Sequence, residues 1–272
     1  MILVLANEGQ MCNQLLTLAS AYSLGLEYQD SVKCPIMNIK LKNSFNFTNN
    51  CQAISIEMKE SLIWKLIAKY LKFARKMFHF NASEKYEVDK MGKLQIFTDW
   101  ISFKDDVVFA KHQKEIRNFF SFRDEIKEKC QKIMLDIKVD DKYLVGVHIR
   151  RGDYKTFNNG CWYYSDEDYL RWMNNLSVCK KVRFVLFSNE KIDINYFADS
   201  GLDITSISGN AVEDLCCLSM CDFIMGPPST YSWWAAMYGN RKRLILEDKN
   251  KMYSWDDFMY LNDRVQAGID KY

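Results

Sequence analysis

The sequence predicts an α/β fold of two domains, the C-terminal one built on a parallel, doubly wound sheet. From Lys142 onward, short apolar stretches alternate with helical stretches, which is the pattern of βαβ units. The N-terminal half opens with an apolar stretch and a helical stretch in the same order. With 272 residues, 48% of them hydrophobic, the chain is long enough to bury two cores.

The C-terminal domain is expected over residues 139–272. Its strands are expected at 143–149, 182–187, 203–207, 222–226 and 243–247. One helix is expected to begin at Ser165, a second to run through Val212 and Met220, a third to span 229–238, and a fourth to lie at the C-terminus. Gly239 suits the end of the helix that begins at Ser229. Right-handed crossovers between such strands give a Rossmann-like sheet.

The N-terminal domain is expected over residues 1–138. It begins with the strand ILVLA and a helix over 11–25, whereas residues 30–60 are ambiguous. Residues 59–80 predict a strong helix with lysines along one face, at positions 65, 69, 72 and 76. This helix is either an ordinary surface helix or a basic amphipathic helix that touches an anionic membrane surface.

Composition narrows the functional classes. The 37 basic and 35 acidic residues give a net charge of +2, which is too balanced for general nucleic-acid binding. The nine cysteines have no CxxC spacing and are interpreted as reduced, mostly buried thiols. Neither a signal-peptide pattern nor an apolar run of about 18 residues is found. We therefore expect a cytoplasmic protein, with peripheral membrane contact only through residues 59–80.

The segment VGVHIRRGDY, residues 145–154, carries polar side chains at the end of a strand. Strand alternation sends His148 and Arg150 to one face, together with Gly146. The opposite face carries the apolar residues Val145, Val147 and Ile149. In open α/β sheets, ligands bind outside the carboxyl ends of the strands, which is where His148 and Arg150 lie.

The chemistry of this segment suits a phosphate. Arg150 and Arg151 offer rigid guanidinium groups, and Gly152 permits close approach of the backbone. The alternative is structural: the arginines pair with Asp153 and other acids, and His148 is an ordinary core histidine.

A second polar segment, DFIMGPPSTYSWW, follows a later strand. The strand ends at Gly226, Pro227 and Pro228 force an extended turn, and Ser229 and Thr230 stand where a helix N-cap belongs. Hydroxyl and backbone N–H groups at a helix start bind anions. A capped core helix without a ligand is the simpler interpretation, and it holds for the tryptophans in either case.

Two further segments bear on the ligand. The strand FVLFSNE ends in Asn189 and Glu190, whose amide and carboxylate could read the N–H groups of a nucleobase. The run Asp166-Glu167-Asp168 matches the D-x-D of metal-dependent sugar transferases, but after Ser165 it is better explained as the acidic first turn of a helix. No metal site is therefore expected.

Together, H-x-R-R-x-D-Y (148–154) and S-T-Y-S-W-W (229–234) resemble the family 11 glycosyltransferases, the α-1,2-fucosyltransferases. The first motif is shared among GDP-fucose enzymes of the α-1,2, α-1,6 and protein O-fucose types. Residues 9–15, GQMCNQL, are similar to the family's G-x-G-N-Q opening, with Cys12 in place of the second glycine.

The resemblance implies a GT-B-like fold, with two Rossmann-like domains facing a cleft, the C-terminal one binding the nucleotide sugar and the N-terminal one the acceptor. It implies inverting, metal-independent transfer of L-fucose from GDP-fucose to a hydroxyl of a glycan acceptor, forming an α-1,2 linkage. It implies that Arg150 holds the β-phosphate, supported by His148 and Arg151. The other implied site residues are Ser229 and Thr230 at the phosphates, Asn189 and Glu190 facing guanine, and Asn13 and Gln14 near the cleft.

The general base is left open. Asp153 is the nearest carboxylate to the arginines and is either the base or a group that orients Arg150. Relatives of the α-1,6 type carry a glutamate shortly after the motif, where this chain has Asn158 and Asn159. Two alternatives therefore stay open: an inverting transferase that uses another nucleotide sugar, and a sugar-nucleotide-binding protein without catalysis.

Overall fold

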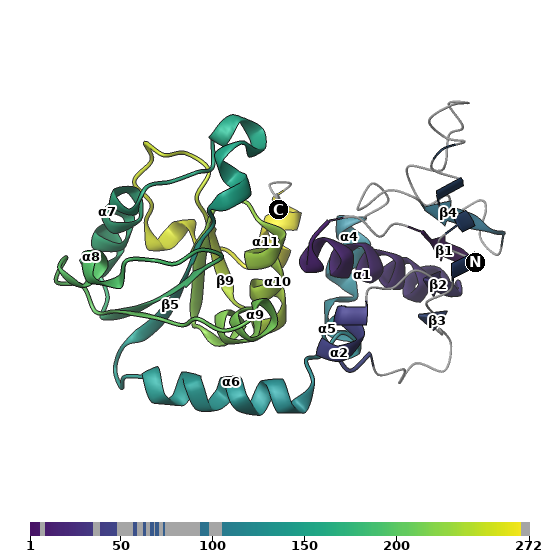
Figure 1. Ribbon diagram of the computed structural model, residues 1–272, viewed down its shortest axis with the longest axis horizontal. Coiled ribbons are helices and arrows are strands. Elements are labelled where there is room, and N and C mark those ends of the chain that lie inside the picture. Colours follow the sequence, from purple (N-terminus) through teal and green to yellow (C-terminus); the bar gives the residue numbers. More distant parts are fainter. Residues whose placement is uncertain are drawn as a thin grey trace. The chain divides into compact units, whose positions relative to one another are not determined.

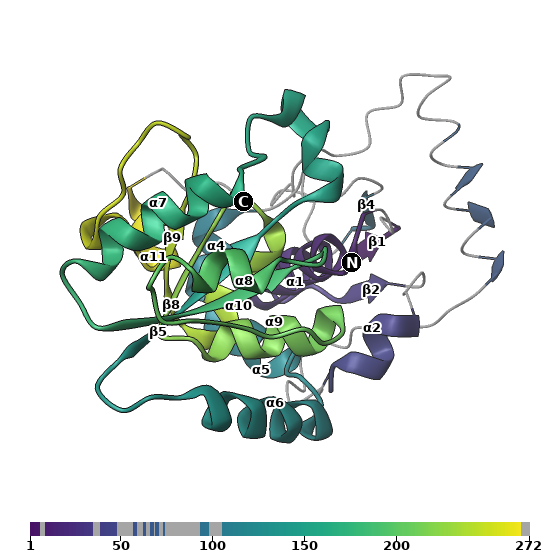
Figure 2. The same ribbon diagram turned by 60° about the vertical axis from the view of Figure 1, so that its left-hand side comes forward.

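The computed structural model describes residues 1–5, 9–34, 39–47, 57–58, 93–97 and 105–267, with single positions between 62 and 73. It divides into two compact units, Met1–Arg123 and Asp124–Tyr272. The division therefore falls before the boundary expected at residue 138. The reason is that α6 (Asp124–Ile137) packs against α9 (Ala211–Met220), within the second unit (Figure 2).

The second unit is built on a parallel five-stranded sheet, β7-β6-β5-β8-β9 (Figure 1). Its strands are β5 (Tyr143–Ile149), β6 (Val182–Ser188), β7 (Ile204–Ser206), β8 (Phe223–Gly226) and β9 (Lys242–Ile245). All five strands match the expected ones to within two residues at each end. The sheet grows outward from β5 in both directions, so the strand order reverses between β5 and β8, where α/β sheets bind ligands.

Helices cover both faces of this sheet. One face carries α7 (Asp166–Ser177) and α8 (Ile194–Ala198), and the other carries α9 and α10 (Thr230–Gly239) (Figure 1). Val145, Val147 and Ile149 belong to the core beneath α7, as the alternation predicted, whereas His148 lies against α10. The remaining elements are η2 (Gly152–Lys155), η3 (Phe157–Gly160), η4 (Trp255–Asp257) and α11 (Leu261–Gln266).

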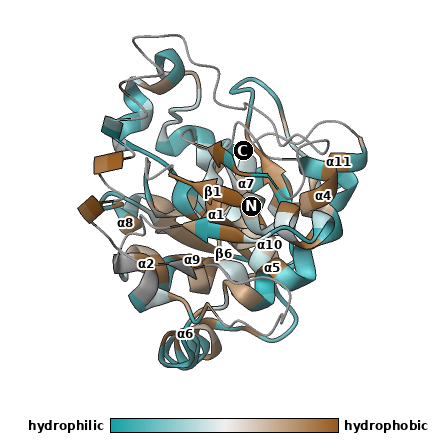
Figure 3. Ribbon diagram, turned by 90° about the vertical axis from the view of Figure 1, so that its right-hand side faces the viewer, coloured by the Kyte–Doolittle hydropathy of each residue, from teal (hydrophilic) through white to brown (hydrophobic). Residues whose placement is uncertain are grey.

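The first unit holds a parallel sheet of order β3-β2-β1-β4. Its strands are β1 (Ile2–Val4), β2 (Val32–Cys34), β3 (Glu57–Met58) and β4 (Gln95–Phe97), and its helices are α1 (Met11–Tyr28), α2 (Ile39–Ser44), α4 (Asp106–Lys111) and α5 (Gln113–Phe119). Figure 3 shows β1 as uniformly hydrophobic, consistent with its full burial. Tyr22 of α1 stacks on Phe119 of α5 at 4.4 Å between ring centroids.

The basic helix expected over 59–80 lies largely outside the described residues. The positions that are described there are helical, and five apolar side chains among them are exposed: Leu62, Ile63, Leu66, Tyr70 and Phe73. Within the described parts of the chain, no helix combines the length and apolar character needed to cross a membrane.

The end of α10 differs from the expected one, whereas the cysteines are as expected. The left-handed residue that ends α10 is Asn240 (φ 49°), not Gly239, which is the last helical residue. Gly239 is needed for close packing, since a Cβ there would lie 2.0 Å from the Ser219 carbonyl oxygen. The eight described cysteines are free thiols, and all but Cys161 and Cys179 are buried, as expected.

Candidate active site

Three strand ends meet at one edge of the second sheet. β5 lies between β6 and β8, with Ile149 opposite Ser188 and Val147 opposite Met225. The polar residues that follow these strands, at 150, 151, 153, 189, 190, 229 and 230, are therefore brought to the same edge. The structure thus brings together every site residue that was predicted in the C-terminal half.

His148 is buried between β8 and α10. It is 3% exposed, and its ring centroid lies 5.1 Å from that of Tyr231. Burial, together with the nearby Arg150 and Arg243 guanidinium groups, lowers the pKa of His148 from 6.5 to about 3. Among the described residues, its Nδ1 atom has no hydrogen-bond partner. His148 is therefore a neutral imidazole in the folded protein, not a cation.

The close approach of β5 and β8 depends on Gly226. A Cβ at this position would lie 2.8 Å from the His148 carbonyl oxygen and 3.0 Å from the His148 Cβ. Any side chain at position 226 would therefore push the two strand ends apart.

Arg150 is directed toward the edge by partners on two sides. Its Nη2 lies 2.9 Å from the Asp153 carboxylate, and its guanidinium carbon lies 5.4 Å from the Tyr154 ring centroid. The Arg150 side chain is 13% exposed, whereas that of Asp153 is 53% exposed. An exposed carboxylate is a weak partner, so the guanidinium can also donate hydrogen bonds to a phosphate.

Arg151 has a different environment from Arg150. Its guanidinium forms an ion pair with Asp166 at the start of α7, and its backbone N–H donates to Asn189 Oδ1 at 2.9 Å. Gly152 has a φ of 63°, and a Cβ there would lie 3.1 Å from Asn189 Nδ2 and 3.3 Å from Glu190 Oε1. Asn189 therefore holds the arginine turn in place, a role that was not expected for it.

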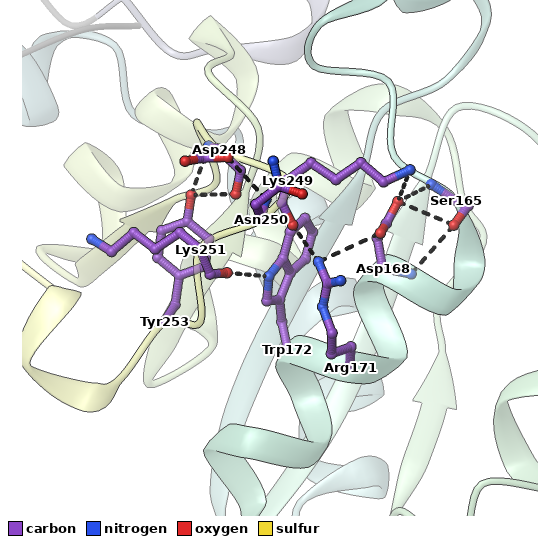
Figure 4. Close-up of polar contacts among 9 residues, drawn as sticks. All are labelled: Ser165, Asp168, Arg171, Trp172, Asp248, Lys249, Asn250, Lys251 and Tyr253. Atoms are coloured by element: carbon purple, nitrogen blue, oxygen red, sulfur yellow. Dashed lines mark hydrogen bonds and ion pairs between the residues drawn. The ribbon is translucent and has the colours of Figure 1, made fainter.

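The acidic run at 166–168 is the first turn of a helix, as predicted. Ser165 Oγ accepts the Asp168 N–H at 3.3 Å, and the Asp168 carboxylate accepts the Ser165 N–H at 3.0 Å (Figure 4). Burial opposes ionisation of Asp168, but the hydrogen bonds from Ser165 and Lys249 hold its pKa below the ordinary value. The described residues contain no group of three or more His, Cys, Asp or Glu side chains arranged to hold a metal ion.

The loop after β9 is joined to α7 by a hydrogen bond and an ion pair. Trp172 Nε1 donates to the Lys251 carbonyl at 2.9 Å, and Lys249 Nζ lies 3.1 Å from the Asp168 carboxylate (Figure 4). These contacts fix the start of α7, and with it Asp166, the partner of Arg151.

The turn between β8 and α10 is fixed by Ser229, the predicted N-cap, and by Arg243, which the sequence did not single out. Ser229 is the N-cap of α10, since its Oγ accepts the Tyr231 N–H at 3.2 Å. Arg243 is 3% exposed and donates to the carbonyls of Pro227 (3.4 Å) and Ser229 (3.2 Å). Arg243 is a charged residue at the start of the otherwise apolar stretch RLIL, and this feature of the sequence could have identified it.

Asn13 and Gln14 lie in the first unit, at the start of α1. Gln14 Nε2 donates to the Gly9 carbonyl at 3.1 Å, which ties the helix start to the preceding loop. Their part in binding the donor stays a prediction.

A family model decides the classification. The model described as glycosyl transferase family 11 matches residues 26–265. The chain belongs to glycosyl transferase family 11. This family 11 enzyme is 24% identical over 286 residues to an α-1,2-colitosyltransferase of Escherichia coli, with 88% of each chain covered. It is 25% identical over 251 residues to galactoside α-(1,2)-fucosyltransferase 1 of Oryctolagus cuniculus, covering 84% of this chain and 62% of that protein.

Solved structures confirm the fold of the family 11 enzyme. NodZ α-1,6-fucosyltransferase, in a crystal soaked with GDP-fucose, superposes with a TM-score of 0.60 at 12% identity, covering 93% of this chain and 97% of that one. POFUT1 in complex with GDP-fucose gives a TM-score of 0.59 at 9% identity, with coverages of 88% and 94%. The GT-B-like α/β fold implied by the sequence motifs is thus confirmed. The enzyme is a glycosyltransferase of the α-1,2-fucosyltransferase type.

Proposed function

We propose that this enzyme transfers L-fucose from GDP-fucose to a hydroxyl of a glycan acceptor, with inversion, forming an α-1,2 linkage and using no metal ion. The observation that carries the proposal is the meeting of Arg150, His148 and the α10 start at the ends of β5 and β8. The names of the α-1,2-transferases to which the chain is similar support the linkage.

The proposed mechanism follows from the charge at this edge. As the bond between the sugar and the β-phosphate breaks, negative charge grows on GDP. The Arg150 guanidinium, hydrogen-bond donors at the start of α10 and the neutral His148 imidazole are fixed in place before the reaction. Fixed donors of this kind stabilise a leaving group without reorganisation.

For Asp153 we propose the orienting role. Its carboxylate lies 2.9 Å from Arg150, and the two residues are three positions apart in the chain, which suits a local ion pair. A base must instead lie next to the acceptor hydroxyl, on the face of the sugar opposite to the diphosphate. An orienting carboxylate acts only through Arg150, so Asp153→Asn should weaken donor binding and turnover together, and by less than Arg150→Ala does.

Nucleotide-dependent stabilisation tests the donor. GDP should raise the melting temperature of the protein, because a ligand that binds only the folded state stabilises it, whereas UDP and CMP should not. An equal shift with all three nucleotides would contradict a guanine-specific site.

Turnover of GDP-fucose tests the chemistry. Arg150→Ala should reduce transfer, or slow hydrolysis, by roughly 10²- to 10³-fold, as for the loss of an oxyanion-hole donor. Arg183→Ala is the matched control, since Arg183 lies on β6 in an ion pair with Asp203 at 2.9 Å, also in the second unit. Undiminished turnover in Arg150→Ala would refute the mechanism.

Colitose is the second candidate sugar, because a colitosyltransferase matches over 88% of both chains. Colitose lacks a hydroxyl that fucose has. A site that hydrogen-bonds this hydroxyl discriminates strongly against the deoxy sugar, whereas an apolar site does not. Competition between GDP-fucose and GDP-colitose in one reaction would show which donor the enzyme prefers.

We also propose that the 59–80 segment contacts an anionic membrane surface. The exposed apolar side chains at 62, 63, 66, 70 and 73, next to four lysines in the sequence, support this proposal. Binding to lipid vesicles tests it.

A further inference from the structure

Tyr154 lies where the two polar segments of the site join. It belongs to η2, directly after Asp153, and is 8% exposed. Its hydroxyl donates to the Pro228 carbonyl at 2.5 Å, in a buried hydrogen bond between residues 74 positions apart. Tyr154 thus connects the arginine segment to the turn that starts α10.

The ring of the same side chain contacts Arg150. The guanidinium carbon lies 5.4 Å from the ring centroid, within the range of a cation–π interaction. Asp153 contacts the guanidinium as well, so a carboxylate and an aromatic ring together restrict its position. The Tyr154 ring is held in turn by Phe157, at 5.4 Å between centroids.

The hydroxyl completes the anchoring of the Pro-Pro-Ser turn. The carbonyls of Pro227 and Ser229 accept hydrogen bonds from Arg243, and the carbonyl between them accepts from Tyr154. Proline fixes φ but leaves ψ adjustable, so the carbonyl contacts decide how the peptide planes are oriented. Without the Tyr154 hydroxyl, the middle carbonyl would be buried without this donor.

We propose that Tyr154 is a positioning residue of the donor site, which keeps the Arg150 guanidinium and the α10 start at a fixed separation. Both groups would bind the same diphosphate, so this inference rests on the proposed function. A displacement of either one weakens the binding of the developing charge, because preorganised donors must lie at their final positions.

Another buried tyrosine provides the matched control. Tyr164 is fully buried, its hydroxyl donates to the Leu246 carbonyl at 2.8 Å, and its ring packs against Tyr169 and Trp172 of α7. Tyr164→Phe removes a similar hydrogen bond from the same unit without touching the arginine segment. Tyr154→Phe removes the hydroxyl and keeps the ring, whereas Tyr154→Leu removes both.

The experiment compares these variants well below their melting temperatures. We expect Tyr154→Phe and Tyr164→Phe to lower the melting temperature similarly. Only Tyr154→Phe should weaken GDP binding and lower kcat for GDP-fucose, each by about fivefold to tenfold, the effect of one buried hydrogen bond. Tyr154→Leu should lose a further factor of about five, through the lost cation–π contact.

Each result has a definite meaning. Equal GDP affinity and kcat in Tyr154→Phe and Tyr164→Phe would overturn the positioning role. Wild-type protein that fails to bind GDP would overturn the proposed function and this inference with it. If Tyr154→Leu does not fold, the two phenylalanine variants alone decide between these outcomes.

Discussion

Acidification from pH 7 to pH 5 should destabilise the second unit through His148, although His148 stays neutral in the folded protein. Its pKa is lowered from 6.5 to about 3 by burial and by the neighbouring Arg150 and Arg243. Between these two values the unfolded chain binds a proton that the folded protein does not. The stabilisation due to the neutral buried imidazole is therefore complete above pH 6.5 and is lost as the pH falls toward 3.

The magnitude follows from the two pKa values. Each pH unit between them corresponds to about 1.4 kcal/mol, which gives about 5 kcal/mol for the whole interval. Between pH 7 and pH 5 only the unfolded chain is titrated appreciably, and the loss in the free energy of unfolding is about 2 kcal/mol. The His148→Gln variant lacks this imidazole. Between pH 7 and pH 5 its free energy of unfolding should therefore fall by about 2 kcal/mol less than that of the wild type.

Two measurements test this reasoning. Urea denaturation at pH 7, 6 and 5 gives the pH dependence for wild type and His148→Gln. In NMR spectra, the imidazole resonance that disappears in His148→Gln should not titrate between pH 8 and pH 4.5, and with only three histidines in the chain it can be assigned. A titration midpoint near 6.5, or parallel stability curves for the two proteins, would refute the buried neutral state.

Three further predictions concern other parts of the chain. Ser165→Ala removes the N-cap of α7 and should reduce the free energy of unfolding by about 1 kcal/mol in urea denaturation, while GDP still binds. Fucosyl transfer should persist in excess EDTA, and a strict requirement for Mn²⁺ or Mg²⁺ would contradict the proposed chemistry. Vesicles containing anionic lipid should retain the protein in a sedimentation assay, and glutamine at positions 65, 69, 72 and 76 should release it, since each lysine contributes about 1 kcal/mol. Equal retention by neutral vesicles would count against the electrostatic contact.

The second sheet could be predicted because each of its strands is an apolar run bounded by polar residues, and alternation correctly assigned the faces of β5. The first unit was harder, because β2, β3 and β4 span only two or three residues each. The placement of α6 could not be predicted, since its packing partner α9 lies far along the chain.

The candidate site, too, could be predicted only in part from the sequence. Residue type and position at a strand end were enough to locate Arg150, His148 and Ser229. Their partners were not predictable: Asn189 binds a backbone N–H of Arg151, and Arg243 reaches the Pro-Pro-Ser turn from a neighbouring strand. The neutral state of His148 likewise depends on burial against α10, which no local pattern encodes.

The contact between Gly226 and His148 bears on how the donor preference could be changed by directed evolution. The Cβ of any residue at 226 would meet the backbone oxygen of His148 at 2.8 Å, so no replacement of the imidazole would make room for it. A library should therefore keep glycine at 226 and place its diversity where side chains reach solvent, as at Asn158 and Glu190. Variants selected in this way could change sugar or nucleotide preference while the strand ends that carry the arginine and the helix start stay together.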